Sequence, residues 1–292
     1  MNKYKEIVIE KFLLLSTLIT ILTTVGIVLV LAIEAFKFFS EVSIFDFFTD
    51  TEWTPLFTQK HYGIMPLLSG TFITSFIAIA VALPIGLTIA IYLSEYAPKK
   101  FRAYIKPGLE LLAAVPTVVY GFFALTVVTP FLQQFIPGLS GFNSLSAGIV
   151  MGIMIIPIIS SLSEDALNAV PYSLREAAYG MGSTRLQTAL KVTVKAASSG
   201  IVVSVILAIS RAIGETMIVA IAAGQQPRLT MNPLVPIETL TAYIVQVSLG
   251  DVQHNSIEYR TIFAAGITLF VFTFILNSVS HWVKTKYREA YE

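Results

Sequence analysis

Six apolar stretches, each long enough to cross a bilayer, constrain the fold of this 292-residue chain more than any other feature. A membrane-spanning helix needs roughly 20 predominantly apolar residues in succession. Only 13% of the residues are charged, whereas a soluble domain carries about 25%. We therefore predict an all-α polytopic membrane protein with six transmembrane helices, at about 12–33, 65–93, 109–132, 145–162, 196–223 and 262–283.

The lysines and arginines predict the orientation, because basic residues gather at the cytoplasmic ends of membrane helices. Fourteen of the 19 flank the two termini and the second and fourth connections. An even number of spans places both termini on one side, which we predict to be the cytoplasm. The apolar run 12–33 exceeds the roughly 7–15 residues of a signal-peptide core, so we expect a retained anchor.

Several functional classes lack support in the sequence. The net charge of +1 gives no case for nucleic-acid binding, and the absence of cysteine excludes disulfides. The histidines, His61, His254 and His281, are scattered and predict no metal site. No GxxxxGKS or GxxxxGKT nucleotide-binding motif occurs, so a transporter driven by ATP would depend on an ATPase in another chain.

Arg211 and Glu215 form the candidate site within the membrane, because both lie in the apolar run 196–223. An ionised group at the centre of a membrane helix costs roughly 2.5–3.5 kcal/mol on insertion scales, and such groups face a polar cavity or a partner. One helical turn separates the two residues, so we expect them on one face, where they can neutralise each other. A structural ion pair is the alternative to a transport role.

The same face of that predicted helix carries a stripe of small and polar residues. The stripe consists of Gly200, Ser204, Ala208, Arg211, Glu215 and Ala222. It predicts either a polar path, with Ser204 in its lining, or tight packing between helices.

Pro84 and Pro116 predict kinks in spans two and three. Next to the second kink, Thr117 and Tyr120 either add polar groups to a pore wall or only shape packing.

The cytoplasmic connection Glu164–Lys195 is patterned as helix, turn, helix. After Pro171, the segment Ser173-Leu-Arg-Glu176 matches a capping box, in which both side chains bind free backbone amides at a helix start. We expect Gly180 and Gly182 to end this short helix.

A second cap, Thr184-Arg-Leu-Gln187, predicts that a helix restarts and leads into span five. On the first helix, the small side chains of Ala177 and Ala178 would let the surface of another protein approach closely. The connection is therefore a candidate docking surface.

Two substantial loops are expected on the outer side, at about 34–64 and 224–261. Within the second, Ile237–Leu249 has a helical pattern that is closed by Gly250, a common helix stop. This helix is either a docking element for an outer partner or a simple connector.

The segment Glu176-Ala-Ala-Tyr-Gly-Met-Gly182 resembles the EAA loop of ABC importer membrane subunits. In that family the short helix fits a groove on the cytoplasmic ATPase and transmits its closure to the membrane helices. The family pattern then expects a proline where Lys195 stands, so we expect an unbroken helix at the start of span five.

Further motifs, in the same order along the chain, are similar to the membrane subunits of phosphate importers. They are Gly70–Ser75, Ala82–Gly86, Ala114–Gly121 and Ser210–Thr216. Two further segments narrow the resemblance to one of the two subunit types of these importers, namely Ile149–Pro157 and Glu258–Phe263. The resemblance covers roughly 63–283. It implies a type I (MetI-like) permease core at 63–285, preceded by a helix and outer loop at 1–62 and followed by a cytoplasmic tail at 286–292.

The resemblance implies a multi-pass plasma-membrane permease that forms half of a phosphate pathway and is not itself an enzyme. It implies a heterodimer with a sibling permease, two ATPase subunits that bind ATP and Mg, and an outer phosphate-binding protein. The expected ATPase contacts are Ser173, Glu176, Ala177, Ala178 and Gly182. The planar fork of Arg211 suits a phosphate oxyanion, and Glu215 would hold the guanidinium when the path is empty.

Three alternatives stay open. The substrate can be another tetrahedral oxyanion, such as molybdate or sulfate. An ion-coupled secondary transporter would use Arg211 and Glu215 as a proton relay and would leave the EAA loop unexplained. An intramembrane enzyme with Glu215 as acid or base lacks a nucleophile and a metal set.

Overall fold

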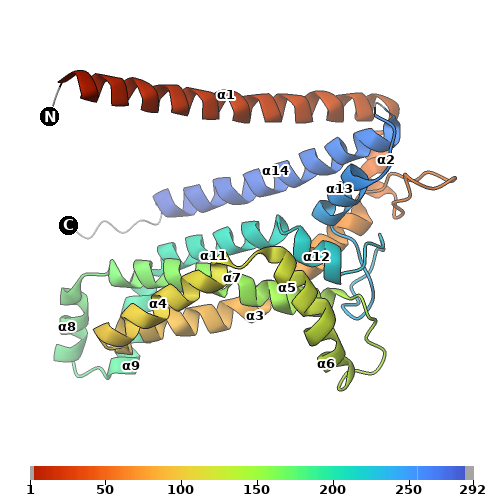
Figure 1. Cartoon of the computed structure of the whole chain (residues 1–292). Helices are drawn as coiled ribbons and strands as arrows, with labels where there is room; N and C mark the ends of the chain where they lie inside the picture. Colours follow the sequence, from red (N-terminus) through yellow and green to blue (C-terminus); the bar gives the residue numbers. More distant parts are fainter. Residues whose placement is uncertain (1–2, 255, 287–292) are drawn as a thin grey trace.

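The computed structural model describes residues 3–254 and 256–286, and helices are the only extended regular elements in this part of the chain (Figure 1). The helices are α1 (Lys3–Glu41), α2 (Ile44–Thr49), α3 (Met65–Ile91), α4 (Lys99–Ala114), α5 (Thr117–Phe123), α6 (Thr129–Gln133), α7 (Ser144–Asn168), α8 (Tyr172–Gly180), α9 (Arg185–Thr188), α10 (Val194–Ala196), α11 (Ser198–Ile213), α12 (Met217–Ala222), α13 (Leu240–Leu249) and α14 (Ile257–Lys286). Wider π-helical turns occupy Tyr92–Tyr96, Ala124–Val128 and Ala189–Thr193.

Four of the six predicted spans are continuous apolar helices long enough to cross a membrane: α1, α3, α7 and α14. The other two are bent helix pairs. Lys100–Ala114 and Thr117–Gln133 meet at 84°, and Arg185–Ala196 and Ser198–Ile213 meet at 72°. The predicted six spans are therefore reached when each bent pair counts as one. The first break includes Pro116, where the sequence predicts a kink, so that prediction is confirmed. The helix expected at 196–223 is not continuous, because it is broken at Ala197 and again between α11 and α12.

The bend before α11 corrects the expectation that Lys195 leaves the helix unbroken. The backbone turns at Ala197, whose φ of −87° and ψ of 3° leave the helical region. Ala197 is 4% exposed and packs with Ala90, Leu167 and Ile201. The buried contacts to α3 and α7 therefore fix a bend that the sequence does not mark with a proline.

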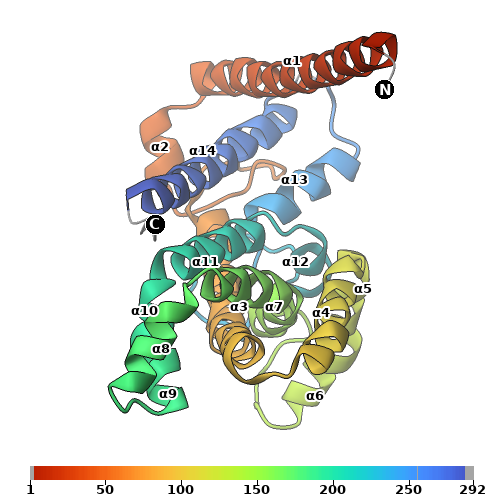
Figure 2. The ribbon, with the colours of Figure 1, turned by 90° about the vertical axis from the view of Figure 1, so that its left-hand side faces the viewer.

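The core of the molecule is built around α7, which packs along α3 and beneath α11 (Figure 2). Gly148 and Gly152 face α3 one turn apart, and Cβ atoms there would lie 2.7 Å from Ile77 Cβ and 2.8 Å from Val81 Cβ. Small residues at this spacing let two membrane helices approach closely. The absence of side chains at both positions sets the distance between α3 and α7.

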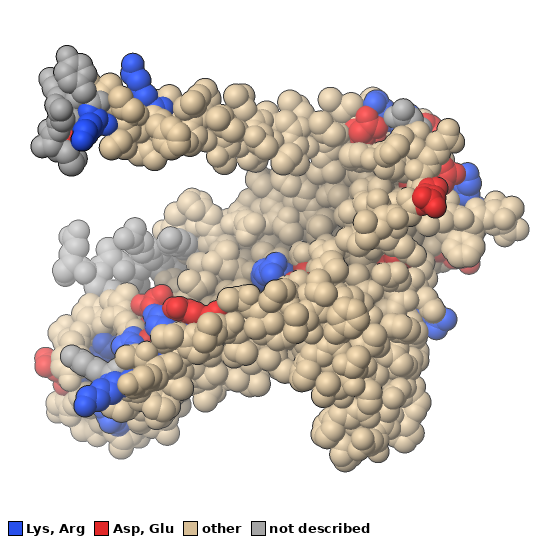
Figure 3. All heavy atoms as spheres, in the orientation of Figure 1, with Lys and Arg blue, Asp and Glu red and all other residues tan. Residues whose placement is uncertain are grey.

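Helix α1 stands apart from this core over most of its length and rejoins it near α2 and α14 (Figure 1). The start of α1, the helix α8 and the end of α14 lie at the same end of the molecule. Charged side chains gather toward the two ends of the long helices, with mostly uncharged surface between them (Figure 3). This arrangement agrees with a bilayer-spanning molecule. The predicted domain boundaries at residues 62 and 285 stay predictions. Residues 287–292 of the predicted tail lie outside the described residues.

The two loops at about 34–64 and 224–261, which we predict to face the outer side, are folded against the end of the core. The first contains α2 and a turn that is closed by a bridge between Trp53 and Tyr62. The second contains α13, which begins at Leu240 after its cap Thr239 rather than at Ile237, and ends before Gly250 as predicted. Its inner face is buried, so α13 packs as part of the core and is more than a simple connector, and its docking role stays a prediction.

Candidate functional site

The break between α11 and α12 carries the charged pair that the sequence singles out. Helix α11 ends at Ile213, and Gly214 terminates it with a φ of −84° and a ψ of 0°. Two further residues lead into α12 at Met217. Glu215 therefore lies in the break and not on a continuous helix with Arg211, and the predicted single helical face is wrong.

Glu215 is held by contacts on every side of its carboxylate. Its Oε1 accepts backbone N–H bonds from Met217 at 3.1 Å and from Ile218 at 3.4 Å, which are free donors at the start of α12. Its Oε2 lies 3.5 Å from a guanidinium nitrogen of Arg211, so the predicted ion pair is confirmed. The backbone carbonyl of Glu215 accepts a 2.6 Å bond from Thr241 Oγ1.

The two members of the pair differ in exposure. The side chain of Glu215 is 2% exposed, whereas that of Arg211 is 49% exposed. Within the described residues, Glu215 is the only acidic residue whose carboxylate lies within 4 Å of the Arg211 guanidinium. The carboxylate is therefore fixed by the fold, while the guanidinium is half exposed on this chain, and its contact with an anion stays a prediction.

The small-residue stripe packs mainly against α7. Ser204 is fully buried, and its Oγ lies 2.8 Å from Ser163 Oγ. Ala208 is fully buried as well, and a Cβ at Gly200 would lie 2.5 Å from Ala166 Cβ. In this structure the stripe joins two helices, and the pathway role of Ser204 stays a prediction.

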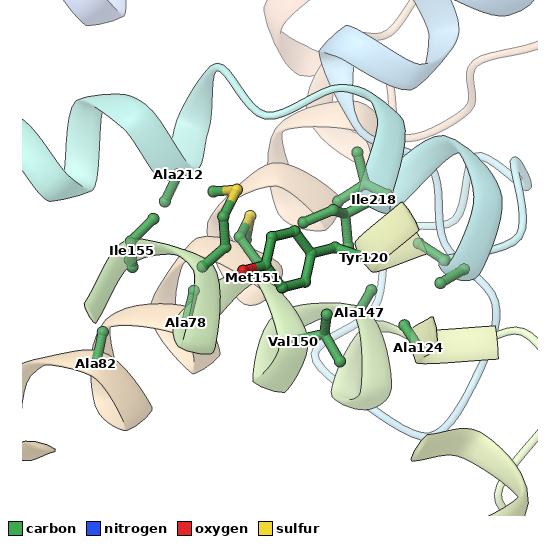
Figure 4. Packing of buried hydrophobic residues seen from close by; sticks show 14 of the residues in the cluster. Ala78, Ala82, Tyr120, Ala124, Ala147, Val150, Met151, Ile155, Ala212 and Ile218 are labelled. Carbon is green, nitrogen blue, oxygen red and sulfur yellow. The ribbon is translucent and has the colours of Figure 1, made fainter. Parts of the chain in front are cut away.

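Thr117 and Tyr120 lie just after the second predicted kink. Thr117 is the first residue of α5 and is partly exposed. The hydroxyl of Tyr120 donates a 2.8 Å bond to the carbonyl of Leu112, so it bridges the break between α4 and α5. Its ring lies among Met151, Ile218 and neighbouring core residues beneath the α11–α12 break (Figure 4). The structure thus gives Tyr120 a role in packing, and its predicted pathway role remains untested.

The connection 164–195, which we predict to be cytoplasmic, folds as helix, turn, helix, but its first cap differs from the prediction. Helix α8 begins at Tyr172 directly after Pro171, and no side chain caps it. Ser173 lies within the first turn, because the extended Pro171 already starts the helix, so the predicted capping box with Glu176 is wrong. Gly182, with a φ of +83°, follows the helix end as expected.

The second cap is confirmed. Thr184 Oγ1 accepts from the Gln187 backbone N–H at 3.3 Å, and Gln187 Oε1 accepts from the Thr184 backbone N–H at 3.0 Å. This reciprocal pair starts α9. The prediction held here because no proline competes for the helix start.

The outer face of α8 is open. Ser173, Glu176 and Ala177 are exposed, Ala178 is partly exposed, and Gly182 is exposed. Next to them, the side chains of Tyr172 and Met181 are 65% and 87% exposed. All five predicted coupling residues therefore belong to one short segment at the end of the molecule, beyond the apolar helices (Figure 1).

Arg175 is a residue of this segment that the sequence analysis treated only as a topological charge. Its side chain is 10% exposed. Its guanidinium donates two 3.1 Å bonds to Glu95 Oε1, which follows α3, and bonds of 2.8 and 2.9 Å to the carbonyls of Val170 and Leu167 at the end of α7. Arg175 therefore ties α8 to both α3 and α7. Sequence spacing gives no signal for this contact, because Glu95 is 80 residues away.

A second buried carboxylate was also missed. Glu164 on α7 is 1% exposed and pairs with Arg102, and Lys106 Nζ lies 3.6 Å from its other oxygen. Both basic residues come from α4. This cluster holds the first half of the broken third span against α7.

A charged pair at a helix break within apolar helices, together with an exposed short helix at one end, fits the class of membrane transport subunits that couple to a separate motor protein. The chain belongs to the family of binding-protein-dependent transport system inner membrane components, whose model matches residues 82–289. It is thus an ABC transporter permease subunit and a multi-pass protein of the plasma membrane, as the EAA resemblance predicted.

Individual relatives agree with this assignment. The chain is 36% identical to a probable ABC transporter permease of Bacillus subtilis, YqgH, over 92% of this chain and 87% of that protein. It is 35% identical to the phosphate transport system permease PstC of Mesorhizobium japonicum, over 82% of this chain and 78% of that protein.

Solved structures show the same fold. A bacterial alginate ABC transporter in complex with a periplasmic protein aligns with a TM-score of 0.65 and 16% identity, over 99% of both chains. The MetNI methionine ABC transporter aligns with a TM-score of 0.53 and 19% identity, over 76% of this chain and 94% of that chain. At this identity the likeness concerns the fold alone, and the MetI-like core predicted from sequence is confirmed.

Proposed function

We propose that this chain is the permease subunit of an ATP-driven phosphate importer and forms half of its translocation pathway. The observation that carries the proposal is the 35% identity to a phosphate transport system permease across 82% of the chain. The half-exposed Arg211 supports it, because a planar guanidinium that keeps its charge donates paired hydrogen bonds to phosphate oxygens.

The assembly that fits this proposal has a PstA-like sibling permease as the other half of the pathway. Two PstB-like ATPase subunits, which bind ATP and Mg, occupy the cytoplasmic side, and a PstS-like phosphate-binding protein delivers the anion from outside. The exposed segment from Ser173 to Gly182 provides the surface that enters the ATPase.

The contacts within the chain suggest how closure of the ATPases reaches the membrane. Movement of α8 displaces the ends of α3 and α7 together, because Arg175 binds both. Helix α7 in turn packs along α11, which carries Arg211 in its last turn. A rigid path of packed helices therefore connects the ATPase surface with the charged pair. There, Glu215 holds the guanidinium when no anion is bound and favours release by weakening anion binding.

The test is radiolabelled phosphate uptake in vesicles that contain this chain with its candidate partners, with and without ATP on the side of the ATPase. We expect uptake that depends on ATP and is lost when Glu176 and Gly182 are replaced while the complex still assembles. Excess sulfate or molybdate that abolished uptake would reassign the substrate. Uptake driven by an ion gradient without the ATPase would contradict the proposal and make Arg211 and Glu215 a relay.

A further inference from the structure

A cavity of about 300 Å³ lies at the end of the molecule opposite α8, outside the helices that cross the membrane. Its walls come from the first outer loop, the loop that follows α12, and α13. They include Trp53, Phe57, Gln225, Arg228, Glu238 and Tyr243. None of these residues belongs to the charged pair or to the coupling segment.

One polar atom of the cavity walls, Oε1 of Glu238, is buried without a hydrogen-bond partner among the described residues, and Glu238 is 1% exposed. The indole of Trp53 in the same wall is also 1% exposed and interacts with Tyr243. Buried polar atoms are paired in the great majority of cases, and those that are not need an explanation. A ligand in the cavity that contacts the Glu238 carboxyl supplies one.

The carboxyl of Glu238 is a donor under ordinary conditions. Burial raises the pKa of Glu238 to about 8, so the group is protonated at neutral pH. A carboxylic acid that is kept neutral by an apolar site can donate a hydrogen bond to an oxyanion. Arg228 is exposed and adds a positive charge beside the cavity, and Gln246 adds a carboxamide.

The wall that contains Gln225 is held in an unusual conformation. Gln225 has a φ of 49°, in the left-handed region that side chains other than glycine seldom adopt. Its Nε2 donates a 3.0 Å bond to the carbonyl of Ala220, which fixes the turn to the end of α12. Strained residues of this kind cluster at binding sites.

We propose that this cavity is an outer oxyanion site, in which the Glu238 carboxyl and the Arg228 guanidinium donate to a phosphate-like anion that lies beside Trp53. The inference rests on the proposed function and gives the anion a binding position on the outer side of the chain. The cavity wall is joined directly to the inner pair, because Thr241, three residues after Glu238, donates to the carbonyl of Glu215.

Trp53 makes the site measurable, because the chain has two tryptophans, Trp53 and Trp282. We would purify the full chain with Trp282→Phe in lipid nanodiscs and follow Trp53 fluorescence during titration with potassium phosphate at neutral pH. Potassium chloride of equal ionic strength is the control. A saturable change with phosphate, absent with chloride, is the expected result.

Variants then identify the donors. Glu238→Gln keeps an N–H donor, so we expect phosphate affinity within about threefold of the parent, whereas Glu238→Leu should weaken it about tenfold or more. Arg228→Gln, at an exposed position that does not threaten folding, should also weaken it about tenfold. Glu52→Leu is the matched control, since Glu52 precedes Trp53 and is exposed.

Each contrary result is informative. A missing response to both phosphate and sulfate, or a phosphate response that Glu238→Leu and Arg228→Gln leave unchanged, overturns the site. A response to arginine amide that Glu238→Gln abolishes would show that the cavity takes a basic side chain, and it also overturns the site. If the assembled importer still carries phosphate in these cases, the proposed function stands. A response to sulfate without one to phosphate would keep the site and contradict phosphate as the substrate.

Discussion

At the scale of single residues, the exposures of Arg211 and Glu215 separate their roles. The Glu215 carboxylate is buried and accepts two backbone N–H bonds besides the ion pair, so it stabilises the break between α11 and α12. Arg211 contributes a partly exposed guanidinium. The pair is thus both a structural ion pair and a candidate anion contact, and the two interpretations from sequence are compatible.

Substitution of Arg211 distinguishes charge from geometry. Arg211→Lys keeps the positive charge but loses the planar fork, so we expect reduced phosphate uptake. Arg211→Gln should lower phosphate uptake by about 10- to 100-fold, because it removes a charged hydrogen bond. Initial uptake rates in vesicles with equal amounts of assembled complex provide the measurement. Ser210→Ala, one position earlier on α11, is the control, and full uptake by Arg211→Gln would remove the arginine from the pathway.

At the scale of helices, the link between α8 and the core depends on Arg175 and Glu95. A buried charge that loses its partner is destabilising by about 3–5 kcal/mol, and the affected contact joins α8 to α3. We expect Arg175→Met and Glu95→Gln to leave ATP hydrolysis in place while uptake per ATP falls about tenfold or more. Lys191→Gln, at an exposed position in the same connection, should leave this ratio unchanged. An unaltered ratio in Arg175→Met would show that α8 transmits movement by another contact.

The sequence predicts those helices whose ends have local causes and misses those that tertiary contacts define. The apolar runs predict α3, α7 and α14, and the Thr184 cap predicts α9. The bend at Ala197 depends on burial against α3 and α7, and the break at Glu215 depends on contacts with α12 and Thr241. No pattern within a single segment encodes such contacts.

The Arg175–Glu95 pair was missed for the same reason. Its members are 80 residues apart and are joined only when α8 folds back against the ends of α3 and α7. The capping box of Ser173 and Glu176 was predicted from its sequence motif but does not form. The extended conformation of Pro171 starts the helix two residues earlier than the capping box requires. This error does not affect the exposure of the predicted coupling residues, because that exposure follows from the helix itself, and their coupling role stays a prediction.

At the scale of the whole molecule, the close contact of α3 with α7 supports both sites. Helix α7 ends at the carbonyls that Arg175 binds and lies beneath the break that carries Glu215. A shift of α7 relative to α3 should therefore disturb the coupling segment and the charged pair together. Gly152 is the position where such a shift can be imposed, because a Cβ there would lie 2.9 Å from the Ala78 carbonyl oxygen, which cannot move aside without its helix.

Gly152→Leu should consequently lower the stability of the isolated chain by about 1–3 kcal/mol, the usual cost of overpacking a tight core, and also reduce uptake. Thermal unfolding of the purified chain in detergent measures the first effect, and vesicle uptake at equal assembly measures the second. Gly26→Leu on α1 is the matched control, since a Cβ at Gly26 meets nothing within 4 Å. Loss of stability with normal uptake would show that the two sites tolerate movement of α7, and that the α3–α7 contact serves folding alone.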